Sequence, residues 1–362
     1  MKIFDTVIIG AGQAGLCAAK HAKELGLSYV VLDKQGIGQV WQARLKGMKL
    51  FTSRQFCGLP ELKFSGVQNG FPAVTEMAQY LQDYVKTFDL DVRQFTPVRL
   101  LSKEQGLYQI ELEAGEMLRA KTVINATGSN QQPIIPSLSS GLSDEVVQHT
   151  SVLTSLDEVP SKKRVVIVGD GATGRQIAGG LASRCQVILA TGRPRGFPKN
   201  KVLGKDIFWW LNLLGILRAD SQSLVAKFIQ RRNPVPCGGF NNARLKKLGV
   251  RILGRAINCS GREMDFNNGS VSDMDIVIWS VGYAERVDWI KLEDCFDEAG
   301  WRHNRGVTTE PGLYLVGRKW LSCRASELVM GTDNDVMHVM DDVVKYLALL
   351  PDVTPCEQRS VA

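Results

Sequence analysis

The 362-residue sequence lacks the motifs of several common catalytic sites. Its eight cysteines form no C-x-x-C pair and have no metal-like spacing with the four histidines, and it contains neither a P-loop nor a G-x-S-x-G motif. These absences argue against a dithiol redox site, a P-loop nucleotidase and a serine hydrolase, and no metal site is expected. We expect reduced, mostly structural thiols at Cys17, Cys57, Cys185, Cys237, Cys259, Cys295, Cys323 and Cys356.

Long hydrophobic runs are also absent. The longest apolar stretch, residues 207–217, is too short to span a bilayer and is interrupted by Asn212 and Gly215. A buried helix is the favoured interpretation of this stretch, and a lid or a surface that touches lipid is the alternative. No membrane span is therefore expected.

Large blocks of one charge are missing as well. The net charge of +7 comes from small separated groups such as Lys162–Arg164 and Arg231–Arg232, with no aromatic residues interleaved. This pattern argues against a nucleic-acid partner and fits attraction of anionic cofactors. The first apolar strand begins almost at Met1, which leaves no room for a signal peptide, so a cytoplasmic location is expected.

The sequence does contain two glycine fingerprints of the G-x-G-x-x-G type, 159 residues apart. The first, Gly10–Gly15, follows an apolar strand (residues 4–9) and precedes a helix expected over 14–25. In this pattern the first glycine makes the turn, the second admits a pyrophosphate and the third lets the helix pack closely on its strand. The next strand leads to Asp33, whose carboxylate is placed to bind ribose hydroxyls of FAD or NAD. A tight turn without a ligand is the alternative.

The second fingerprint, Gly169–Gly174, lies between another apolar strand and a helix expected over 174–183. Ala190 stands where the first unit has Asp33, and Arg193 and Arg195 follow. Loss of the acid and gain of arginines favours a ribose 2′-phosphate, hence NADPH, with NADH kept as an alternative. Arginines that merely solvate an exposed loop are the competing interpretation.

The order of the elements predicts an α/β fold with two Rossmann-like dinucleotide-binding domains. Strand-and-turn segments at 122–128 and 275–283 are similar and mark the exits of the two units. The predicted division is an FAD-binding domain over 1–148 and 281–362, with an NAD(P)H-binding domain inserted over 149–280. A last amphipathic helix is expected from about Asp333, its N-cap, with its positive end facing the flavin.

Taken together, these segments resemble the flavin-containing monooxygenases, in particular the short bacterial class B flavoprotein monooxygenases. The resemblance covers nearly the whole chain and includes segment 48–60, which is similar to the flavin-side loop of auxin-forming members. The family pattern F-x-G-x-x-x-H is only partly matched, since His149 is present but Ser143 and Glu145 replace the Phe and Gly. Arg318 follows Gly317 where related reductases keep an acid.

The resemblance implies an FAD-dependent, NAD(P)H-consuming monooxygenase. Such an enzyme forms a C4a-peroxyflavin and oxygenates a soft nucleophile, sulfur or nitrogen, of a small molecule, with molecular oxygen as co-substrate. In the flavin-side loop Phe51 is expected as a wall and Thr52 or Ser53 as hydrogen-bond donors, where family members often present an asparagine. Arg54 is a candidate for a pyrophosphate or an acidic substrate, or is simply solvated.

The full set of expected cofactor-binding residues follows from the two fingerprints, the strand exits and the resemblance. It comprises Gly10, Gly12, Gln13, Gly15, Asp33, Lys34, Trp41, Gln42, Ala126, Thr127, Gly128, Gly169, Gly171, Ala172, Thr173, Gly174, Arg193, Arg195, Gly282 and Gly317.

Three other functions compete with oxygenation. A flavin disulfide reductase of the same architecture needs a redox cysteine pair, which the sequence does not offer. An NAD(P)H reductase or oxidase would pass electrons to a carrier protein, a quinone or oxygen. A nucleotide-bound sensor without catalysis would show negligible NADPH oxidation.

Overall fold

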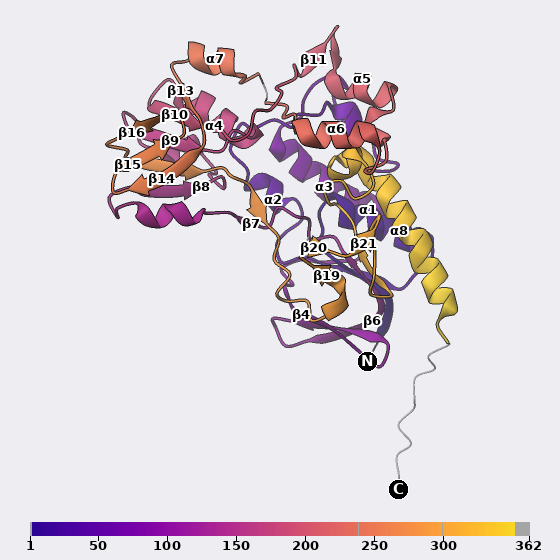
Figure 1. Ribbon diagram of the computed structural model, residues 1–362. Helices are drawn as coiled ribbons and strands as arrows, with labels where there is room; N and C mark the ends of the chain where they lie inside the picture. Colours follow the sequence, from indigo (N-terminus) through magenta and orange to yellow (C-terminus); the bar gives the residue numbers. More distant parts are fainter. Residues whose placement is uncertain (1, 238, 299, 352–362) are drawn as a thin grey trace.

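The protein consists of two lobes connected by two strands that run between them (Figure 1). The computed structural model describes residues 2–237, 239–298 and 300–351. One lobe contains both ends of the described chain, and the other is built from the middle of the sequence. Each lobe has its own sheet.

The larger sheet has the strand order β21-β22-β23-β6-β1-β2-β3, with β5 on β6 and β4 on β5. Its centre is parallel, because β1 pairs in parallel with both β2 and β6, while the β4–β5–β6 meander and the β21–β22–β23 edge are antiparallel. The strands are β1 (Ile3–Ile9), β2 (Tyr29–Leu32), β3 (Val92–Arg93), β4 (Val98–Glu104), β5 (Leu107–Leu112), β6 (Met117–Asn125), β21 (His303–Asn304), β22 (Val307–Thr308) and β23 (Leu313–Leu315).

Helices cover one face of this sheet. The helices α1 (Gln13–Glu24), α3 (Val74–Phe88) and α8 (Val329–Leu349) share one hydrophobic core with it, in which Leu16, Met77 and Val336 are fully buried. The opposite face carries a second core with Ile290 and Leu292. Short elements α2 (Gln39–Gln42) and η1 (Arg54–Phe56) interrupt the long segment between β2 and α3.

The smaller sheet, β13-β10-β9-β17-β8, is parallel throughout. Its central strands are buried almost end to end, as expected for apolar runs covered on both faces. Helices α4 and α7 cover one face and the β14–β16 meander covers the other. The bounds are β8 (Val147–Thr150), β9 (Arg164–Val168), α4 (Ala172–Leu181), β10 (Gln186–Ala190), α7 (Asn242–Lys247), β13 (Arg251–Leu253), β14 (Ala256–Ser260), β15 (Glu263–Phe266), β16 (Gly269–Val271) and β17 (Ile276–Trp279).

A helical insertion between β10 and α7 leaves the smaller sheet and packs over the larger lobe (Figure 1). It contains a hairpin and three short helices: β11 (Lys201–Val202), β12 (Lys205–Asp206), α5 (Ile207–Leu213), η4 (Ile216–Arg218) and α6 (Leu224–Arg232).

The remaining elements connect the lobes or edge them. The connectors β7 (Gln132–Pro133) and β18 (Tyr283–Ala284) pair antiparallel where the chain leaves and re-enters the larger lobe. Also present are η2 (Ser137–Gly141), η3 (Leu156–Glu158), η5 (Glu293–Cys295), β19 (Phe296–Asp297), β20 (Gly300–Trp301) and η6 (Arg324–Glu327).

Two sequence expectations are corrected by the observed elements. The last helix begins at Val329 with Leu328 as N-cap, so Asp333 lies inside the helix, where it pairs with His21 of α1 instead of capping. Residues 207–217 do not form one buried helix. The chain turns at Gly215, which adopts a φ of 71°, and Leu213 and Leu214 are exposed.

Candidate functional site

The two glycine fingerprints occupy equivalent places, each in the turn between a central parallel strand and the helix that follows it. Gly10 and Gly169 adopt φ of 108° and 111°, a region that favours glycine. A Cβ on Gly10 would come within 2.6 Å of the Ala126 carbonyl oxygen, and one on Gly169 would collide with the Ser280 carbonyl. The turns therefore press against the ends of β6 and β17 and need glycine for packing.

The third glycine of each fingerprint is equally constrained. A Cβ on Gly15 would collide with the Gly10 carbonyl, and one on Gly174 with the Gly169 carbonyl. The middle glycines differ, because a Cβ on Gly12 or Gly171 would meet no atom within 4 Å. Their open side faces a cavity, which leaves room for a ligand against the backbone.

Three helix N-termini line the same cavity. Helices α1, α4 and α8 have no side-chain cap and no acidic residue in the first turn. Residues 11–14, 170–173 and 328–329 line the cavity at these termini. Free backbone N–H groups and the positive ends of three helix dipoles make this cavity favourable for anionic groups.

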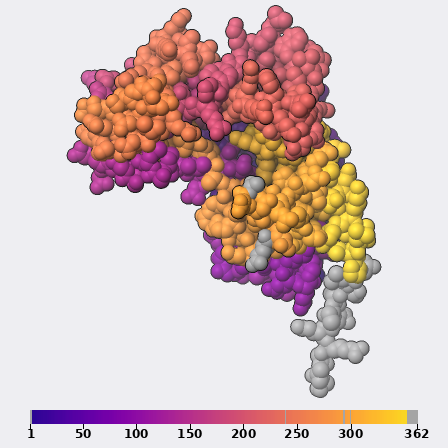
Figure 2. All heavy atoms as spheres, in the orientation of Figure 1, coloured from indigo at the N-terminus to yellow at the C-terminus, as the bar shows by residue number. Residues whose placement is uncertain are grey.

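The cavity lies between the lobes and has a volume of about 2030 Å³ (Figure 2). This is larger than the usual volume of a pocket for one small ligand, roughly 300–1,000 Å³. Most expected site residues line it: Gly10, Gly12, Gln13, Asp33, Lys34, Trp41, Phe51, Thr52, Ala126, Thr127, Gly128, Gly169, Gly171, Ala172, Thr173, Arg193, Arg195, Gly282 and Gly317. Gly15, Gln42, Ser53 and Gly174 do not.

Asp33 lies at the end of β2 beside the first fingerprint. Its Oδ2 accepts the N–H of Ala11 at 2.6 Å and its Oδ1 accepts the N–H of Gln35 at 2.7 Å. Each oxygen has a further lone pair, so the carboxylate of this cavity-lining residue is held in place and can still accept from a ribose hydroxyl.

The corresponding corner of the second unit is basic. Ala190 is buried where Asp33 stands in the first unit, Arg193 is exposed, and Arg195 lies 3.5 Å, Nε to Oδ1, from the buried Asp170. Arg231 of α6 and Arg255 line the same cavity and were not expected as site residues. They lie 41 and 65 residues beyond Ala190 with no motif around them, so only the fold brings them here.

The flavin-side loop, segment 48–60, is held in place by contacts of its own residues and of the helical insertion. Phe51 lines the cavity and packs on Phe208, with ring centroids 5.8 Å apart, while the Thr52 hydroxyl lies 3.3 Å from the Cys57 sulfur. Ser53 is fully buried, and its N–H donates to Asp206 Oδ2 at 2.7 Å. The expected role of Ser53 as a donor in the cavity is therefore not matched by its position.

Arg54 and His149 also lie away from the cavity lining. Arg54 pairs with Glu76, and the backbone N–H of Ala73 together with this guanidinium holds the pKa of the Glu76 carboxyl below its usual value. His149 lies half-buried on β8. Neither position fits direct contact with a cofactor.

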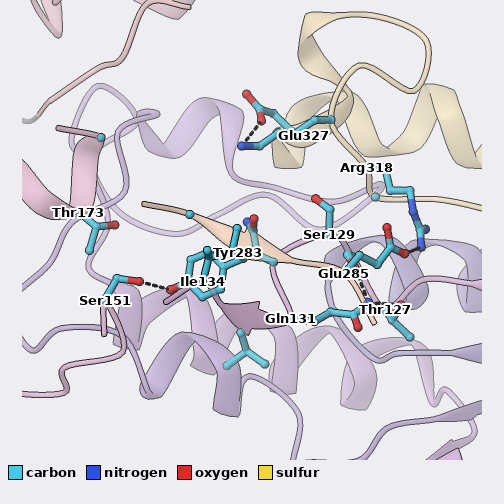
Figure 3. Close-up of a pocket in the computed structure, with 18 of the residues that line it drawn as sticks. Thr127, Ser129, Gln131, Ile134, Ser151, Thr173, Tyr283, Glu285, Arg318 and Glu327 are labelled. Carbon is cyan, nitrogen blue, oxygen red and sulfur yellow. Dashed lines mark hydrogen bonds and ion pairs between the residues drawn. The ribbon is translucent and has the colours of Figure 1, made fainter. Parts of the chain in front are cut away.

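A buried arginine lies at one end of the cavity, where the second connector returns (Figure 3). Arg318 pairs with Glu285 and donates from Nη1 to the Asn125 carbonyl at 3.1 Å. Burial lowers the pKa of Arg318 and the Glu285 carboxylate opposes this shift. Trp301 completes the group, donating from Nε1 to Glu285 at 3.1 Å. The connector is thus fastened to the exits of β6 and β23.

On the opposite side of Figure 3, the side chains of Ser151 and Tyr283 point toward each other. The Ser151 hydroxyl donates to the Tyr283 hydroxyl oxygen at 3.0 Å, and Arg44 Nη1 donates to the same oxygen at 3.3 Å. These residues were not expected as site residues. Through these bonds the segment that contains Arg44 is joined to Ser151 of the smaller lobe at the cavity wall.

The cysteines do not supply redox chemistry to this cavity. All seven cysteines in the described part of the chain are free thiols, and none lines the cavity, while Cys356 lies outside the described residues. Burial raises the pKa of the Cys57 thiol, which lies against the cavity-lining Thr52, to about 11, so it stays protonated at neutral pH. Among the residues that the structure describes, no cysteine pair lies at the cavity to serve a disulfide reductase.

One group of ligand-type side chains lies elsewhere. Cys17 and His21 of α1 and Asp333 of α8 bring a sulfur, a ring nitrogen and a carboxylate oxygen within 4.8 Å of one another. His21 Nε2 lies 2.8 Å from Asp333 Oδ1. The residues had not been expected to meet, because 312 positions separate His21 from Asp333.

Comparison with known proteins identifies relatives over nearly the whole chain. Residues 7–201 match the family model described as pyridine nucleotide-disulphide oxidoreductase. The CzcO-like oxidoreductase of Geobacillus kaustophilus is 33% identical over 95% of this chain and 99% of its own, and indole-3-pyruvate monooxygenase YUCCA6 of Arabidopsis thaliana is 25% identical over 94% and 90%.

Solved structures share the fold. The flavin-containing monooxygenase of Stenotrophomonas maltophilia superposes with a TM-score of 0.77 at 22% identity, covering 96% of this chain and 100% of that one. The bacillithiol disulfide reductase of Staphylococcus aureus superposes with a TM-score of 0.66 at 15% identity, covering 94% and 98%. The predicted fold class and resemblance are confirmed. No helix of the described chain is long and apolar enough to cross a membrane.

Proposed function

The chain belongs to the pyridine nucleotide-disulphide oxidoreductase family and has the architecture of its NAD(P)H-dependent flavoprotein monooxygenases, and from this premise we propose that it oxygenates a sulfur or nitrogen atom of a small molecule, using FAD, NADPH and molecular oxygen. One observation carries the proposal. Two uncapped helix N-termini, each behind an open fingerprint glycine and each following a parallel strand of a different sheet, face one cavity of about 2030 Å³.

The residues of the larger lobe fit FAD. Gly12 leaves space for a pyrophosphate at the α1 N-terminus, and Asp33 presents a fixed carboxylate for a ribose. The uncapped N-terminus of α8 offers positive potential for the electron-rich edge of an isoalloxazine ring. We assign residues 1–148 and 281–362 to this FAD-binding domain.

The residues of the smaller lobe, which we assign to 149–280, fit NADPH. Gly171 leaves the corresponding space at the α4 N-terminus. Arg193, Arg231 and Arg255 take part in none of the ion pairs found in the described chain, so their guanidinium groups are available for a 2′-phosphate. Arg195 is the weaker candidate because it lies against Asp170.

Bound FAD supplies the redox chemistry, accepting hydride from the nicotinamide and activating oxygen. The protein supplies position and exclusion. Phe51 and Trp41 wall the cavity with apolar surface, and the N-termini of α1 and α4 would hold the phosphates. The connector pair fastened by Arg318 and Tyr283 keeps the lobes facing each other. Exclusion of water from the reacting atoms is what distinguishes oxygen transfer from release of peroxide.

Product analysis tests the proposal directly. Holoenzyme supplied with NADPH, oxygen and a small sulfide such as thioanisole is expected to form sulfoxide in proportion to the NADPH consumed. Screening amines in the same way identifies nitrogen acceptors. NADPH consumption matched by hydrogen peroxide alone, across sulfides and amines, would reject oxygenation.

An FAD-dependent NAD(P)H reductase or oxidase remains the second candidate, and one observation favours it. The loop position beside the flavin offers Thr52, whose hydroxyl already contacts Cys57, where related monooxygenases often present a side-chain amide. If this loop donates no hydrogen bond to bound oxygen, electrons pass to oxygen, a quinone or a carrier instead.

The cytoplasmic location stays a prediction.

A further inference from the structure

Seven large hydrophobic side chains are exposed together on the helical insertion. Among the described residues they are seven of the twenty exposed large hydrophobics, and they fall within 27 consecutive positions. Leu203 and Leu224 are 85% and 86% exposed. We call this set the apolar patch: Val202, Leu203, Leu213, Leu214, Leu224, Val225 and Phe228. The β11–β12 hairpin, α5 and α6 that carry it gather at one end of the molecule (Figure 1).

The apolar patch is not the face by which the insertion packs on the larger lobe, because the insertion buries a different set of side chains there. Phe208 and Leu217 pack on Phe56 and Leu328 of the larger lobe. Asp206 caps α5 and binds the Ser53 N–H, which fixes the insertion to the flavin-side loop. The exposed leucines therefore lie on the outer side of a docked element. Large apolar side chains concentrated on the exposed side of one element are typical of an interaction site.

The segment that carries the apolar patch is also rich in exposed positive charge. Residues 199–232 carry seven exposed cations and one exposed acid, Asp220. None of the seven forms an ion pair within the described chain. Three lie over aromatic rings: Lys201 over Phe71 at 5.5 Å, Lys205 over Trp209 at 5.5 Å and Arg232 over Phe228 at 4.8 Å. The cations are Lys199, Lys201, Lys205, Arg218, Lys227, Arg231 and Arg232.

This combination selects among partners. A symmetric pair of chains would place the same patch on itself, which brings seven unpaired cations against seven. An anionic lipid surface complements both features at once, since acyl chains accept leucine and phenylalanine side chains and phosphate groups attract lysine and arginine. Two half-buried tryptophans, Trp209 and Trp210, add the aromatic residues that prefer such an interface.

We propose that the apolar patch and its cations, apart from the cavity-lining Arg231, dock the enzyme on the surface of an anionic lipid bilayer. The docking lies on the membrane and does not cross it. The patch also adjoins the cavity, because Gln230 and Arg231 of α6 line it. A docked enzyme therefore holds its cavity close to the lipid surface. The inference rests on exposure and charge and is independent of the reaction catalysed.

Vesicle sedimentation with the full-length holoenzyme tests the inference. We expect cosedimentation with vesicles of phosphatidylcholine containing 30% phosphatidylglycerol, much weaker binding to pure phosphatidylcholine, and release by 0.5 M NaCl. The double change Leu224→Gln and Phe228→Gln should weaken binding at least roughly tenfold, because two side chains lose their burial in lipid. Lys227→Gln should weaken it roughly fivefold by removing one charge.

Leu349→Gln is the matched control, since Leu349 is an equally exposed helical leucine (82%) at the far end of α8. It should bind vesicles like the unchanged protein, and NADPH oxidation should be the same in all variants because none of the changed residues lines the cavity. Absence of vesicle binding would overturn the inference, as would equal binding to neutral and anionic vesicles. Self-association abolished by the double change, without vesicle binding, would assign the patch to a second copy instead.

Discussion

At the scale of single residues, the glycines of each fingerprint divide into two classes that the sequence alone cannot separate. The outer glycines are required by the protein itself, because a Cβ there would enter a neighbouring carbonyl. The middle glycines, Gly12 and Gly171, are not required by any contact in the described chain. Substitution at these positions is therefore expected to separate folding from ligand binding.

Gly12→Ala and Gly15→Ala are a matched pair for this test. Gly15→Ala should lower the free energy of unfolding by several kcal/mol, since the added methyl group collides with backbone. Gly12→Ala should fold with an unchanged unfolding midpoint for the cofactor-free protein but bind FAD at least roughly tenfold more weakly, about 1.4 kcal/mol. Chemical denaturation and flavin fluorescence titration measure the two quantities. Equal FAD affinity in Gly12→Ala and the unchanged protein would show that the pyrophosphate does not bind at this turn.

The arginines of the second unit give a prediction about cofactor choice. Arg193→Ala should weaken NADPH binding by about 1–3 kcal/mol while leaving NADH nearly unchanged, because only NADPH carries the 2′-phosphate. Arg302→Ala is the control, an exposed arginine that does not line the cavity. Steady-state KM values for the two nicotinamides provide the comparison. Equal losses for both nucleotides would reject a contact to the 2′-phosphate.

At the scale of elements, the helical insertion depends on one buried carboxylate. Asp206 is fully buried and accepts the N–H of Ser53 at 2.7 Å and that of Phe208 at 3.0 Å. The first bond joins the insertion to the flavin-side loop and the second caps α5. Asp206 thus both positions and caps α5, a helix too short to be stable alone.

Asp206→Asn should lower the free energy of unfolding by about 1.5–3 kcal/mol, because a charge-assisted bond is lost and a buried N–H is left poorly paired. Urea denaturation measures the change. Asp220→Asn is the control, since Asp220 is exposed and accepts one local N–H from Gln222, and it should change stability little. A loss in Asp206→Asn no larger than that of the control would show that α5 is held by its apolar contacts instead.

Most elements could be predicted from the sequence, and the exceptions have physical reasons. Apolar strands next to the fingerprints are read correctly because parallel strands are buried on both faces. The start of α8 was placed at Asp333 because a carboxylate suits an N-cap, but this side chain is held by His21 of a helix more than 300 positions away. Arg231 and Arg255 could not be found, because only the fold brings them to the cavity.

At the scale of the whole molecule, the two lobes are held at their connectors by polar side chains. Arg318 and Glu285 lie 7% and 18% exposed at the point where the chain re-enters the larger lobe. Glu285→Ala should lower the free energy of unfolding by about 3–5 kcal/mol, because it leaves a buried guanidinium without its carboxylate. The neighbouring exposed pair Arg286 and Asp288 offers the control, and Asp288→Ala should have little effect. Thermal and urea unfolding that rank the two variants equally would contradict the assigned role of Arg318.

The central claim is that one cavity holds two dinucleotides close enough to exchange electrons. Anaerobic titration of the FAD-loaded protein with NADPH, followed at the visible flavin absorbance, tests it most directly. We expect one FAD per chain and loss of the absorbance with one equivalent of NADPH. A flavin that stays oxidised while NADPH binds, or a second dinucleotide that fails to bind at all, would contradict it.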